Sequence, residues 1–345
     1  MKAVTFAGSG TVEVTTVPDP VLVEPTDALV QVHRAAICGT DLHTVAHPDG
    51  LDRGAILGHE FTGTVLSVGS AVRTFRPGDR VSGADFTACG HCWWCRAGNH
   101  WECADRQFFG TGNAFGPALA GTQAEFVRVP HADIVLHAIA DVVSDDSALF
   151  FGDILATGYA AVQRCDLLPG GTVAIIGGGP VGQMASLAAQ SCGAGPVVLV
   201  EPVQDRRTTA KAHGAVVTPP ETARELINTL TDGRGADAVI EAVGGPKGLD
   251  TAMGLVRRRG TVVSVGVHQQ PTWPLPVAQA FADELTMRFA IGNAIRDRDR
   301  LEGLVASGAI DPTIVIDQRV ALDDAPSAYE AMAQRRTLKA IIDVS

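Results

Sequence analysis

The sequence predicts an α/β protein in which a β-rich first domain precedes a doubly wound parallel sheet. The length of 345 residues is sufficient for two domains that each bury a core. A hydrophobic fraction of 46% and a charged fraction of 19% are typical of globular proteins. The pattern of apolar segments changes near residue 170, and this change separates the two domains.

The first part of the chain, up to about residue 150, is expected to be rich in strands. Short apolar segments such as ALVQVHRAAI and FTGTVLSVG alternate there with glycine, proline and aspartate. Such spacing of apolar runs and turn residues is typical of all-β or β-rich domains.

The second part is expected to alternate strands with helices. The apolar run TVAIIGGG precedes a helical stretch, the apolar PVVLVE precedes another, and this alternation continues to GTVVSVG. Repeated β-α-β units predict a parallel sheet with helices on its faces. Beyond Ile295 the chain predicts one helix and a final strand without repeating the unit, so we expect it to return to the first domain.

The charge of the chain argues against several classes of partner. A formal net charge of −11 disfavours binding to a phosphate backbone. The basic run from Arg257 to Arg259 is expected at the end of a helix, where cations complement the helix dipole.

No secretory signal and no apolar span of eighteen residues is visible, so we expect a cytoplasmic protein without a membrane partner.

Four of the seven cysteines fall within fifteen residues. Cys89, Cys92, Cys95 and Cys103 follow the pattern C-x2-C-x2-C-x7-C. In a reducing compartment this spacing favours one tetrahedral zinc ion over disulfides, with an iron–sulfur site or a plain cysteine cluster as the alternatives. Four thiolates leave no open coordination position, so this zinc is expected to be structural. Cys165 and Cys192, outside the cluster, are expected in the core.

A glycine-rich motif predicts a dinucleotide site. The segment Gly177 to Gly182 fits G-x-G-x-x-G between a predicted strand and a predicted helix. Gly177 is expected in the tight turn, Gly179 against a pyrophosphate and Gly182 against the strand, while Pro180 and Val181 open the helix. The alternative is a glycine-rich connection without a ligand.

The residues at the end of the next predicted strand bear on the choice of cofactor. Glu201 lies nineteen residues past Gly182, where a carboxylate binds the adenosine ribose hydroxyls and repels a 2′-phosphate. This predicts NAD in preference to NADP. Arg206 and Arg207 follow closely and weaken that preference.

A second set of side chains suits a metal but also has ordinary explanations. The segments ICGTDLH, LGHEF and FGDILATGY supply Cys38, His59 and Asp153. Taken singly, these are a small buried residue, a core histidine and a helix N-cap. Spacing alone does not decide between the two readings.

The chain resembles the zinc-dependent alcohol dehydrogenases of the medium-chain dehydrogenase/reductase superfamily over nearly its whole length. The motifs CGTDLH, GHEFTGTVLSVG, RPGDRVSG, the cysteine cluster, D-x-x-x-T-G and GGGPVG stand in that family's order. The segments GADFTACGHCWWC and GDILATGY are most similar to those of the formaldehyde-dehydrogenase-like branch. The resemblance implies a GroES-like catalytic domain over residues 1–153 with a structural zinc lobe at 89–103, a Rossmann NAD-binding domain over 154–295, and a returning segment over 296–345.

The resemblance also implies roles for single residues. It places a catalytic zinc on Cys38, His59 and Asp153, with a fourth position open, so that the chain holds two Zn(II) in all. Glu60 is implied to lie beside that zinc. The alternative role for Glu60 is to orient its loop. Thr40 and His43 are implied as a proton relay, with a simple turn residue as the alternative for Thr40. Thr157, Val265 and Val267 are implied to face the nicotinamide end of the cofactor.

The predicted function is reversible hydride transfer between a primary or secondary alcohol and NAD. Polyol and threonine dehydrogenases are the alternatives within the family. A non-catalytic dinucleotide-binding protein and a zinc-free reductase are the alternatives outside it. The expected partners are a small alcohol or carbonyl substrate and further copies of the chain, as a homotetramer or a homodimer joined by an edge strand near residue 290.

Overall fold

The computed structural model describes residues 1–344, which form two compact units. Unit 1 comprises Met1–Asp153, Asn293–Ser307 and the chain from Ile316 onward. Unit 2 comprises Ile154–Gly292 and Gly308–Val315. The chain therefore leaves unit 2 and returns to unit 1 near its end, while the functional labels of the two units stay predictions.

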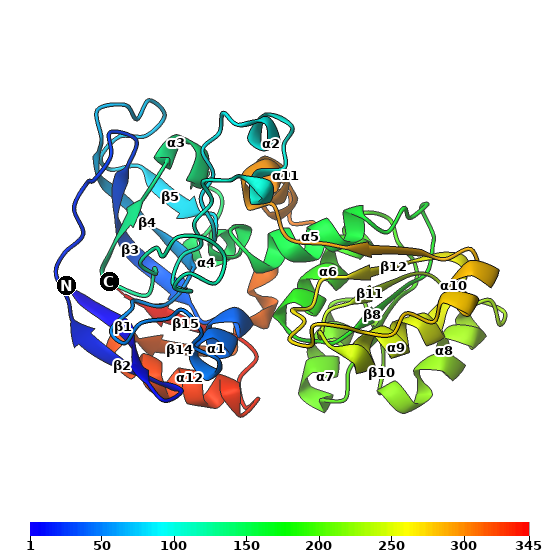
Figure 1. Ribbon diagram of the computed structural model, residues 1–345. Helices are drawn as coiled ribbons and strands as arrows, with labels where there is room; N and C mark the ends of the chain where they lie inside the picture. Colours follow the sequence, from blue (N-terminus) through cyan, green and yellow to red (C-terminus); the bar gives the residue numbers. More distant parts are fainter. Residues whose placement is uncertain (345) are drawn as a thin grey trace. The chain divides into compact units, whose positions relative to one another are not determined.

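Unit 1 is built on a seven-stranded sheet in the order β14-β15-β3-β4-β5-β7, with β6 paired to β3 (Figure 1). Its pairs are antiparallel except β14 with β15. The strands are β3 (Ala28–Ala36), β4 (Glu60–Val68), β5 (Arg80–Gly83), β6 (Phe126–Val129), β7 (Leu136–Ala138), β14 (Gln318–Ala321) and β15 (Ala340–Asp343), beside the hairpin β1 (Lys2–Gly8) and β2 (Thr11–Thr16).

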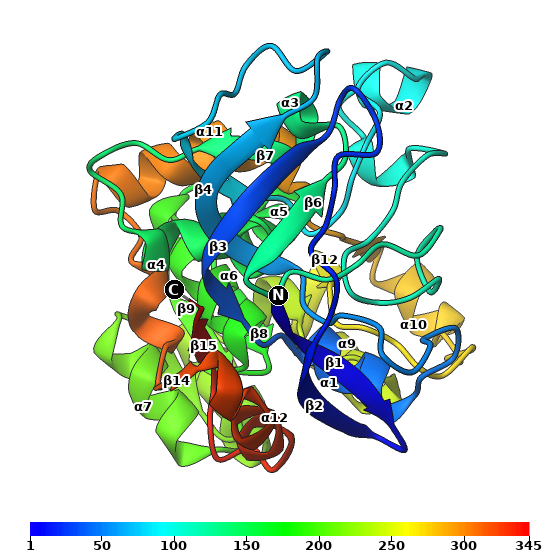
Figure 2. The ribbon, with the colours of Figure 1, turned by 90° about the vertical axis from the view of Figure 1, so that its left-hand side faces the viewer.

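The helices of unit 1 range from four residues in α2, α3 and α4 to 13 residues in α11. Figure 2 shows β3 and β4 side by side, with α11 in the same unit. The helices are α1 (Gly39–Ala46), α2 (Trp93–Arg96), α3 (Ala132–Val135), α4 (Asp145–Ala148), α11 (Ala294–Ala306) and α12 (Ala325–Ala333), with 3-10 turns η1 (His100–Glu102), η2 (Leu149–Phe151) and η5 (Leu322–Asp324). The strand-rich prediction for this part of the chain is confirmed.

Unit 2 is a six-stranded parallel sheet in the order β10-β9-β8-β11-β12-β13. Its strands are β8 (Val173–Ile176), β9 (Val197–Val200), β10 (Val216–Thr218), β11 (Ala236–Glu241), β12 (Val256–Ser264) and β13 (Thr286–Phe289). Its helices are α5 (Ile154–Gln163), α6 (Pro180–Ser191), α7 (Gln204–Ala212), α8 (Ala223–Leu230), α9 (Pro246–Leu255) and α10 (Val277–Ala282), with 3-10 turns η3 (Pro220–Thr222) and η4 (Pro312–Val315).

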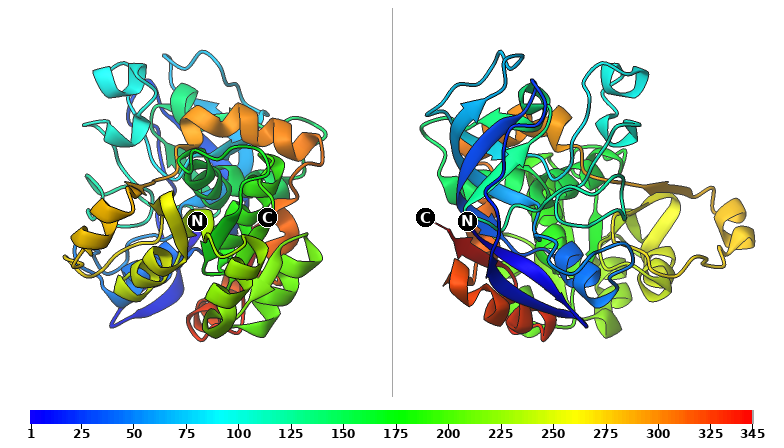
Figure 3. Two further views of the ribbon diagram at one scale, coloured as in Figure 1. Left: turned by 90° about the vertical axis from the view of Figure 1, so that its right-hand side faces the viewer. Right: turned by 60° about the vertical axis from the view of Figure 1, so that its left-hand side comes forward.

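Helices cover both faces of the unit 2 sheet (Figure 3). Ala174 and Ile176 of β8 belong to one buried cluster with residues of α8 and α9. Ile175 points the other way, toward the start of α6, and Leu199 packs against α7. Successive side chains of a strand point to opposite faces of the sheet. A strand that is apolar at nearly every position therefore packs against helices on both faces. The predicted doubly wound sheet is confirmed.

The expectation for the basic run at residues 257–259 is wrong. The helix α9 ends at Leu255 and β12 begins at Val256, so the three arginines lie in a strand. Arg257 Nε lies 2.7 Å from Asp237 Oδ1, and Arg258 and Arg259 pair with Asp283 and Glu284. These arginines therefore form ion pairs with acidic side chains of neighbouring segments and do not complement a helix dipole.

Within residues 1–344, no helix is long and apolar enough to cross a membrane.

Candidate active site and metal centres

The sulfur of Cys38, a ring nitrogen of His59 and a carboxylate oxygen of Asp153 converge inside unit 1. The three ligand atoms all lie within 4.8 Å of one another. Cys38 Sγ lies 3.1 Å from Asp153 Oδ2, and His59 Nε2 lies 3.3 Å from the same oxygen. Cys38 is the N-cap of α1, His59 immediately precedes β4, and Asp153 immediately precedes α5. One thiolate, one imidazole and one carboxylate at this spacing fit a tetrahedral zinc ion with one open position.

The His59 ring is held by a carboxylate on its other side. His59 Nδ1 lies 3.2 Å from Asp41 Oδ1, and both side chains are fully buried. Burial alone lowers the pKa of His59, but the carboxylates of Asp41 and Asp153 raise it well above its usual value. A carboxylate behind a histidine is a common way to orient a metal-ligating ring, and it leaves Nε2 facing Cys38 and Asp153.

Asp41 is tied to its surroundings by two further contacts. Its Oδ2 accepts hydrogen bonds from the Cys38 backbone N–H at 2.8 Å and from Gln123 Nε2 at 3.2 Å. Gln123 in turn accepts a hydrogen bond from the Tyr329 hydroxyl at 2.7 Å. The sequence supplied Asp41 only as a member of the CGTDLH motif, and its role depends on contacts with His59 and with Gln123, which is 82 positions away.

A buried ion pair lies next to the three ligands. Lys339, which immediately precedes β15, contacts Glu60 through its ammonium group, and both side chains are fully buried. Burial raises the pKa of Glu60, and the charge of Lys339 opposes that rise. Glu60 therefore has a cationic partner, and its Oε1 has no hydrogen-bond partner among the described residues. Nothing in the local sequence of Lys339 pointed to this pairing, which joins residues 279 positions apart.

Asp85 is a further acidic group that sequence reasoning missed. Its backbone N–H donates to the Gly152 carbonyl at 3.3 Å, which places it beside the segment that carries Asp153. Burial and then the charge of Asp153 raise the pKa of Asp85 well above its usual value. In the sequence, Asp85 is only one residue of the segment GADFTACG, and no motif assigns it a role. Phe86, which follows Asp85, and Phe109 are both fully buried.

The two residues of the predicted proton relay lie on one helix. Thr40 and His43 are three positions apart on α1, a spacing that places side chains on the same face. Thr40 is half-buried and His43 is exposed. Partial burial of the ring and then the neighbouring His47 lower the pKa of His43. The helix therefore presents one partly buried hydroxyl and one titratable ring near solvent.

The four-cysteine cluster forms a closed set of thiols. The sulfurs of Cys89, Cys92, Cys95 and Cys103 all lie within 4.8 Å of one another. Backbone N–H groups of residues 89, 92 and 95 each point at a cluster sulfur at 3.4 Å, which is the arrangement expected around thiolates. The set fits a four-coordinate zinc ion without an open position.

All seven cysteines are free thiols. Cys165 is buried as predicted, but Cys192 is exposed at the C-terminus of α6, so the expectation that it lies in the core is wrong. Cys192 caps the C-terminus of α6, and a helix end faces solvent more often than its centre does.

The glycines of the dinucleotide motif differ in what surrounds them. Gly177 has a φ of +97°, and a Cβ on Gly182 would lie 1.9 Å from the Gly177 carbonyl oxygen. A Cβ on Gly179 would meet no atom within 4 Å. The positive φ of Gly177 and the close backbone contact at Gly182 therefore exclude larger residues at these two positions. Gly179 leaves open space at the N-terminus of α6. Pro180 and Val181 occupy the first positions of that helix.

Glu201 is buried directly after β9. Only 3% of it is accessible, its Oε2 accepts from the Gly178 N–H at 2.6 Å, and its Oε1 accepts from the Val203 N–H at 2.8 Å. The carboxylate thus joins the end of β9 to the glycine turn. Arg206 is half-buried on α7, and its carbonyl accepts from Gln183 Nε2 at 2.9 Å.

The remaining predicted cofactor residues also lie in unit 2. Thr157 is half-buried in the first turn of α5, and a Cβ on Gly292 would lie 2.5 Å from its hydroxyl. Val265 and Val267 follow β12, with Val265 half-buried and Val267 exposed. The carboxyl ends of parallel strands are where ligands bind in open α/β sheets, so these positions suit the expected role.

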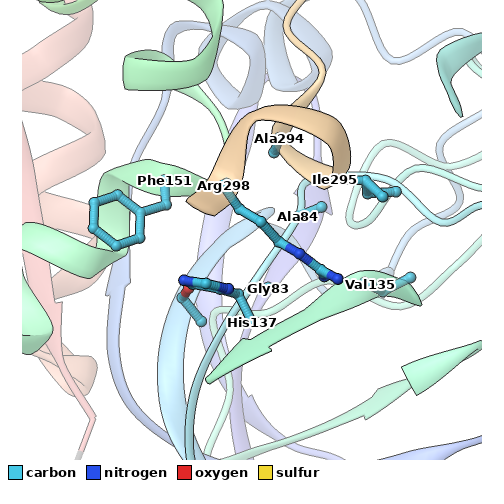
Figure 4. A pocket seen from close by; sticks show the side chains of 10 residues that line it. Gly83, Ala84, Val135, His137, Phe151, Ala294, Ile295 and Arg298 are labelled. Carbon is cyan, nitrogen blue, oxygen red and sulfur yellow. The ribbon is translucent and has the colours of Figure 1, made fainter. Parts of the chain in front are cut away.

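A small cavity in unit 1 belongs to the packing of α11 and not to either ligand set. Figure 4 shows Arg298 of α11 and His137 of β7 projecting toward it. Arg298 donates to the carbonyls of Ile134 and Leu136 at 2.8 and 2.5 Å, and His137 Nε2 lies 3.2 Å from Glu302 Oε2. The polar groups at this cavity therefore hold the returning helix to the sheet.

The chain matches known proteins in both units. Residues 24–140 match the family described as alcohol dehydrogenase GroES-like domain, and residues 180–307 match the family described as zinc-binding dehydrogenase. A probable zinc-binding alcohol dehydrogenase of Mycobacterium tuberculosis is 37% identical over 97% of this chain and 86% of its own length. The alcohol dehydrogenase TADH from Thermus sp. ATN1 is similar in structure, with a TM-score of 0.96, 37% identity and full coverage of both chains. A putative zinc-binding dehydrogenase of Sinorhizobium meliloti bound to NADP has a TM-score of 0.87 at 30% identity and covers 99% of each chain.

Proposed function

Because the chain belongs to the zinc-dependent alcohol dehydrogenases of the medium-chain dehydrogenase/reductase superfamily, we propose that it oxidises a primary or secondary alcohol reversibly with NAD. It is an oxidoreductase acting on CH–OH groups. The observation that carries the proposal is the convergence of Cys38, His59 and Asp153 to within 4.8 Å, beside a buried ion pair. The formaldehyde-dehydrogenase-like branch stays a prediction.

Cys38, His59 and Asp153 would hold the catalytic zinc. When bound, zinc supplies a Lewis acid that lowers the pKa of a hydroxyl group, and the nicotinamide ring supplies the hydride acceptor. Cys38 and Asp153 provide two negative charges that match the charge of the ion. Asp41 fixes the His59 ring so that Nε2 faces the other two ligands.

The proton released on alcohol oxidation would leave along α1. In this proposal the Thr40 hydroxyl accepts a proton while giving up its own at the half-buried end of the path, and His43 passes a proton to solvent. Partial burial and the neighbouring His47 lower the pKa of His43, and an imidazole near solvent suits the exchange of a proton with water. Glu60 would lie beside the metal, and Lys339 would keep its charge balanced.

Unit 2 would bind the cofactor along the carboxyl ends of its strands. The open space at Gly179 and the N-terminus of α6 suit a pyrophosphate, and Glu201 suits a ribose without a 2′-phosphate. Thr157, Val265 and Val267 would face the nicotinamide end. The Sinorhizobium meliloti relative is bound to NADP, so Arg206 near Glu201 is the position at which the preference for NAD would be tested.

A second zinc would occupy the four-cysteine cluster and stabilise its loop. We propose a homotetramer, with a homodimer as the alternative, in which copies meet at the edge strand β13. Phe281 and Phe289 near this edge are 85% and 64% exposed, and exposed apolar side chains beside an unpaired strand favour association. We expect the protein in the cytoplasm.

Turnover measured at 340 nm would test the proposal. The zinc-loaded protein would be offered NAD and NADP with primary, secondary, aromatic and polyhydroxy alcohols and threonine. We expect turnover with NAD and a simple alcohol. Activity confined to polyols or threonine would support the alternatives within the family, whereas a chain that binds NAD and zinc without turnover of any alcohol would support a non-catalytic role.

A further inference from the structure

A partly buried hydrogen-bond chain connects two turns at the carboxyl edge of the unit 2 sheet. The Ser264 hydroxyl lies 2.9 Å from Glu241 Oε2 and 2.7 Å from His268 Nε2. The Gly245 backbone N–H donates to His268 Nδ1 at 2.9 Å. Glu241 is fully buried at the end of β11, Ser264 is the last residue of β12, and His268 follows β12.

The hydrogen-bond geometry fixes the direction of every proton in this chain. Because Nδ1 of His268 accepts from a backbone N–H, the neutral ring carries its proton on Nε2 and donates it to Ser264 Oγ. The Ser264 hydroxyl then donates to the Glu241 carboxylate. Ser264 is therefore not activated as a nucleophile, since histidine donates to it and does not accept from it. The chain is a positioning device.

Glu241 also organises both turns through their backbones. Its Oε1 accepts from the N–H groups of Val243 and Gly244 at 2.8 and 2.7 Å. Its carbonyl accepts from the N–H groups of Val265 and Gly266 at 2.8 and 3.1 Å. One buried residue thus holds the turn at 242–245 and the turn at 265–268.

The two turns also approach each other too closely for any side chain. A Cβ on Gly244 would lie 2.1 Å from the Val267 carbonyl oxygen, and a Cβ on Gly266 would lie 2.2 Å from the Gly244 nitrogen. Gly244 and Gly245 both have positive φ, at +84° and +87°. The position of the 265–268 backbone is therefore set by its contact with the 242–245 turn.

We propose that Ser264 and His268 are positioning residues that set the enzyme's affinity for the nicotinamide end of its cofactor. They do so by locking the 265–268 backbone, which carries Val265 and Val267, against the turn after β11. The adenosine end is held elsewhere, at the glycine turn and Glu201. This inference rests on the proposed function, because it requires that a nicotinamide dinucleotide binds at this edge.

The test compares two ligands that differ only in the nicotinamide ring. Calorimetric dissociation constants for NAD and for ADP-ribose would be measured on the zinc-replete wild type and on Ser264→Ala. We expect the variant to bind NAD about threefold to tenfold more weakly, the range for loss of one or two hydrogen bonds, and to bind ADP-ribose within twofold of the wild type. KM for NAD should rise in parallel while kcat at saturating NAD stays within twofold.

Three further variants separate positioning from general damage. Ser264→Thr keeps the hydroxyl and should retain most of the affinity for NAD. His268→Phe keeps a ring but removes both nitrogens, and it should lose affinity for NAD in the same direction as Ser264→Ala. His213→Ala, an exposed histidine after α7, serves as the control without effect.

Two results would overturn the inference: equal loss of affinity for both ligands, or no loss for either, in both Ser264→Ala and His268→Phe. A wild type that binds neither ligand would instead contradict the proposed function. The two failures are therefore distinguishable in one set of titrations.

Discussion

The two sets of metal-ligating side chains in unit 1 differ in how the chain assembles them. The four cysteines come from fifteen consecutive residues, and their spacing alone predicts the cluster. Cys38, His59 and Asp153 come from three segments, with 115 positions between the first and the last. A local set is visible in the sequence itself, whereas a dispersed set becomes visible only through a resemblance or through the fold.

The surroundings of the two sets differ as well. The cysteine cluster is supported mainly by backbone N–H groups that point at sulfur. The dispersed set is surrounded by the buried charges of Asp41, Glu60 and Lys339. Backbone support suits a site that only holds a loop, while buried charges suit a site at which charge changes during a reaction.

The largest expected effect comes from breaking the dispersed set. Cys38→Ser should lower kcat by at least about 10³-fold, roughly 4 kcal/mol, because the site loses one anionic ligand. Circular dichroism and the thermal midpoint should remain close to those of the wild type. Cys192→Ser is the matched control, since that cysteine is exposed and lies outside both sets. Full activity in Cys38→Ser would refute the assignment.

The next largest effect is expected from removing one ligand of the four-cysteine cluster. Cys103→Ser should lower the free energy of unfolding by about 3–5 kcal/mol, because loss of a structural metal belongs to the most destabilising class of change. Chemical denaturation would measure it, with activity recorded per folded molecule. A variant as stable as the wild type would mean that this cluster holds no structural metal.

A third variant tests the buried charges around the dispersed set. Lys339→Met should lower the free energy of unfolding by about 3 kcal/mol, because the Glu60 carboxylate would be left buried without its partner. Lys339→Arg keeps the positive charge and should cost less. If both variants unfolded at the same denaturant concentration as the wild type, the pair would have no role in stability.

The smallest of these effects concerns the orientation of His59. Asp41→Asn keeps the shape of the side chain but removes its charge, and it should weaken zinc binding by about 10-fold to 100-fold, or about 1.4–2.7 kcal/mol. Competition with a chromophoric chelator would measure this loss. Zinc release should affect one ion per chain only, and loss of both ions would contradict a local effect of Asp41.

The sequence was most informative where structure depends on neighbours in the chain. The alternation of apolar strands and helices predicted the parallel sheet, and the glycine spacing predicted the turn before α6. It was least informative where partners are distant, as for Lys339 with Glu60 and for Ser264 with Glu241. The prediction that the arginines at 257–259 end a helix was wrong for the same reason, because their acidic partners come from other segments.

Zinc content per chain tests the central claim most directly. The wild type, Cys38→Ser and Cys103→Ser would be saturated with zinc, desalted and measured by atomic absorption. The account predicts two zinc ions in the wild type and one in each variant, with turnover lost in Cys38→Ser alone. A wild type with one zinc ion, or a Cys38→Ser variant that retains two, would contradict a second metal site at Cys38, His59 and Asp153.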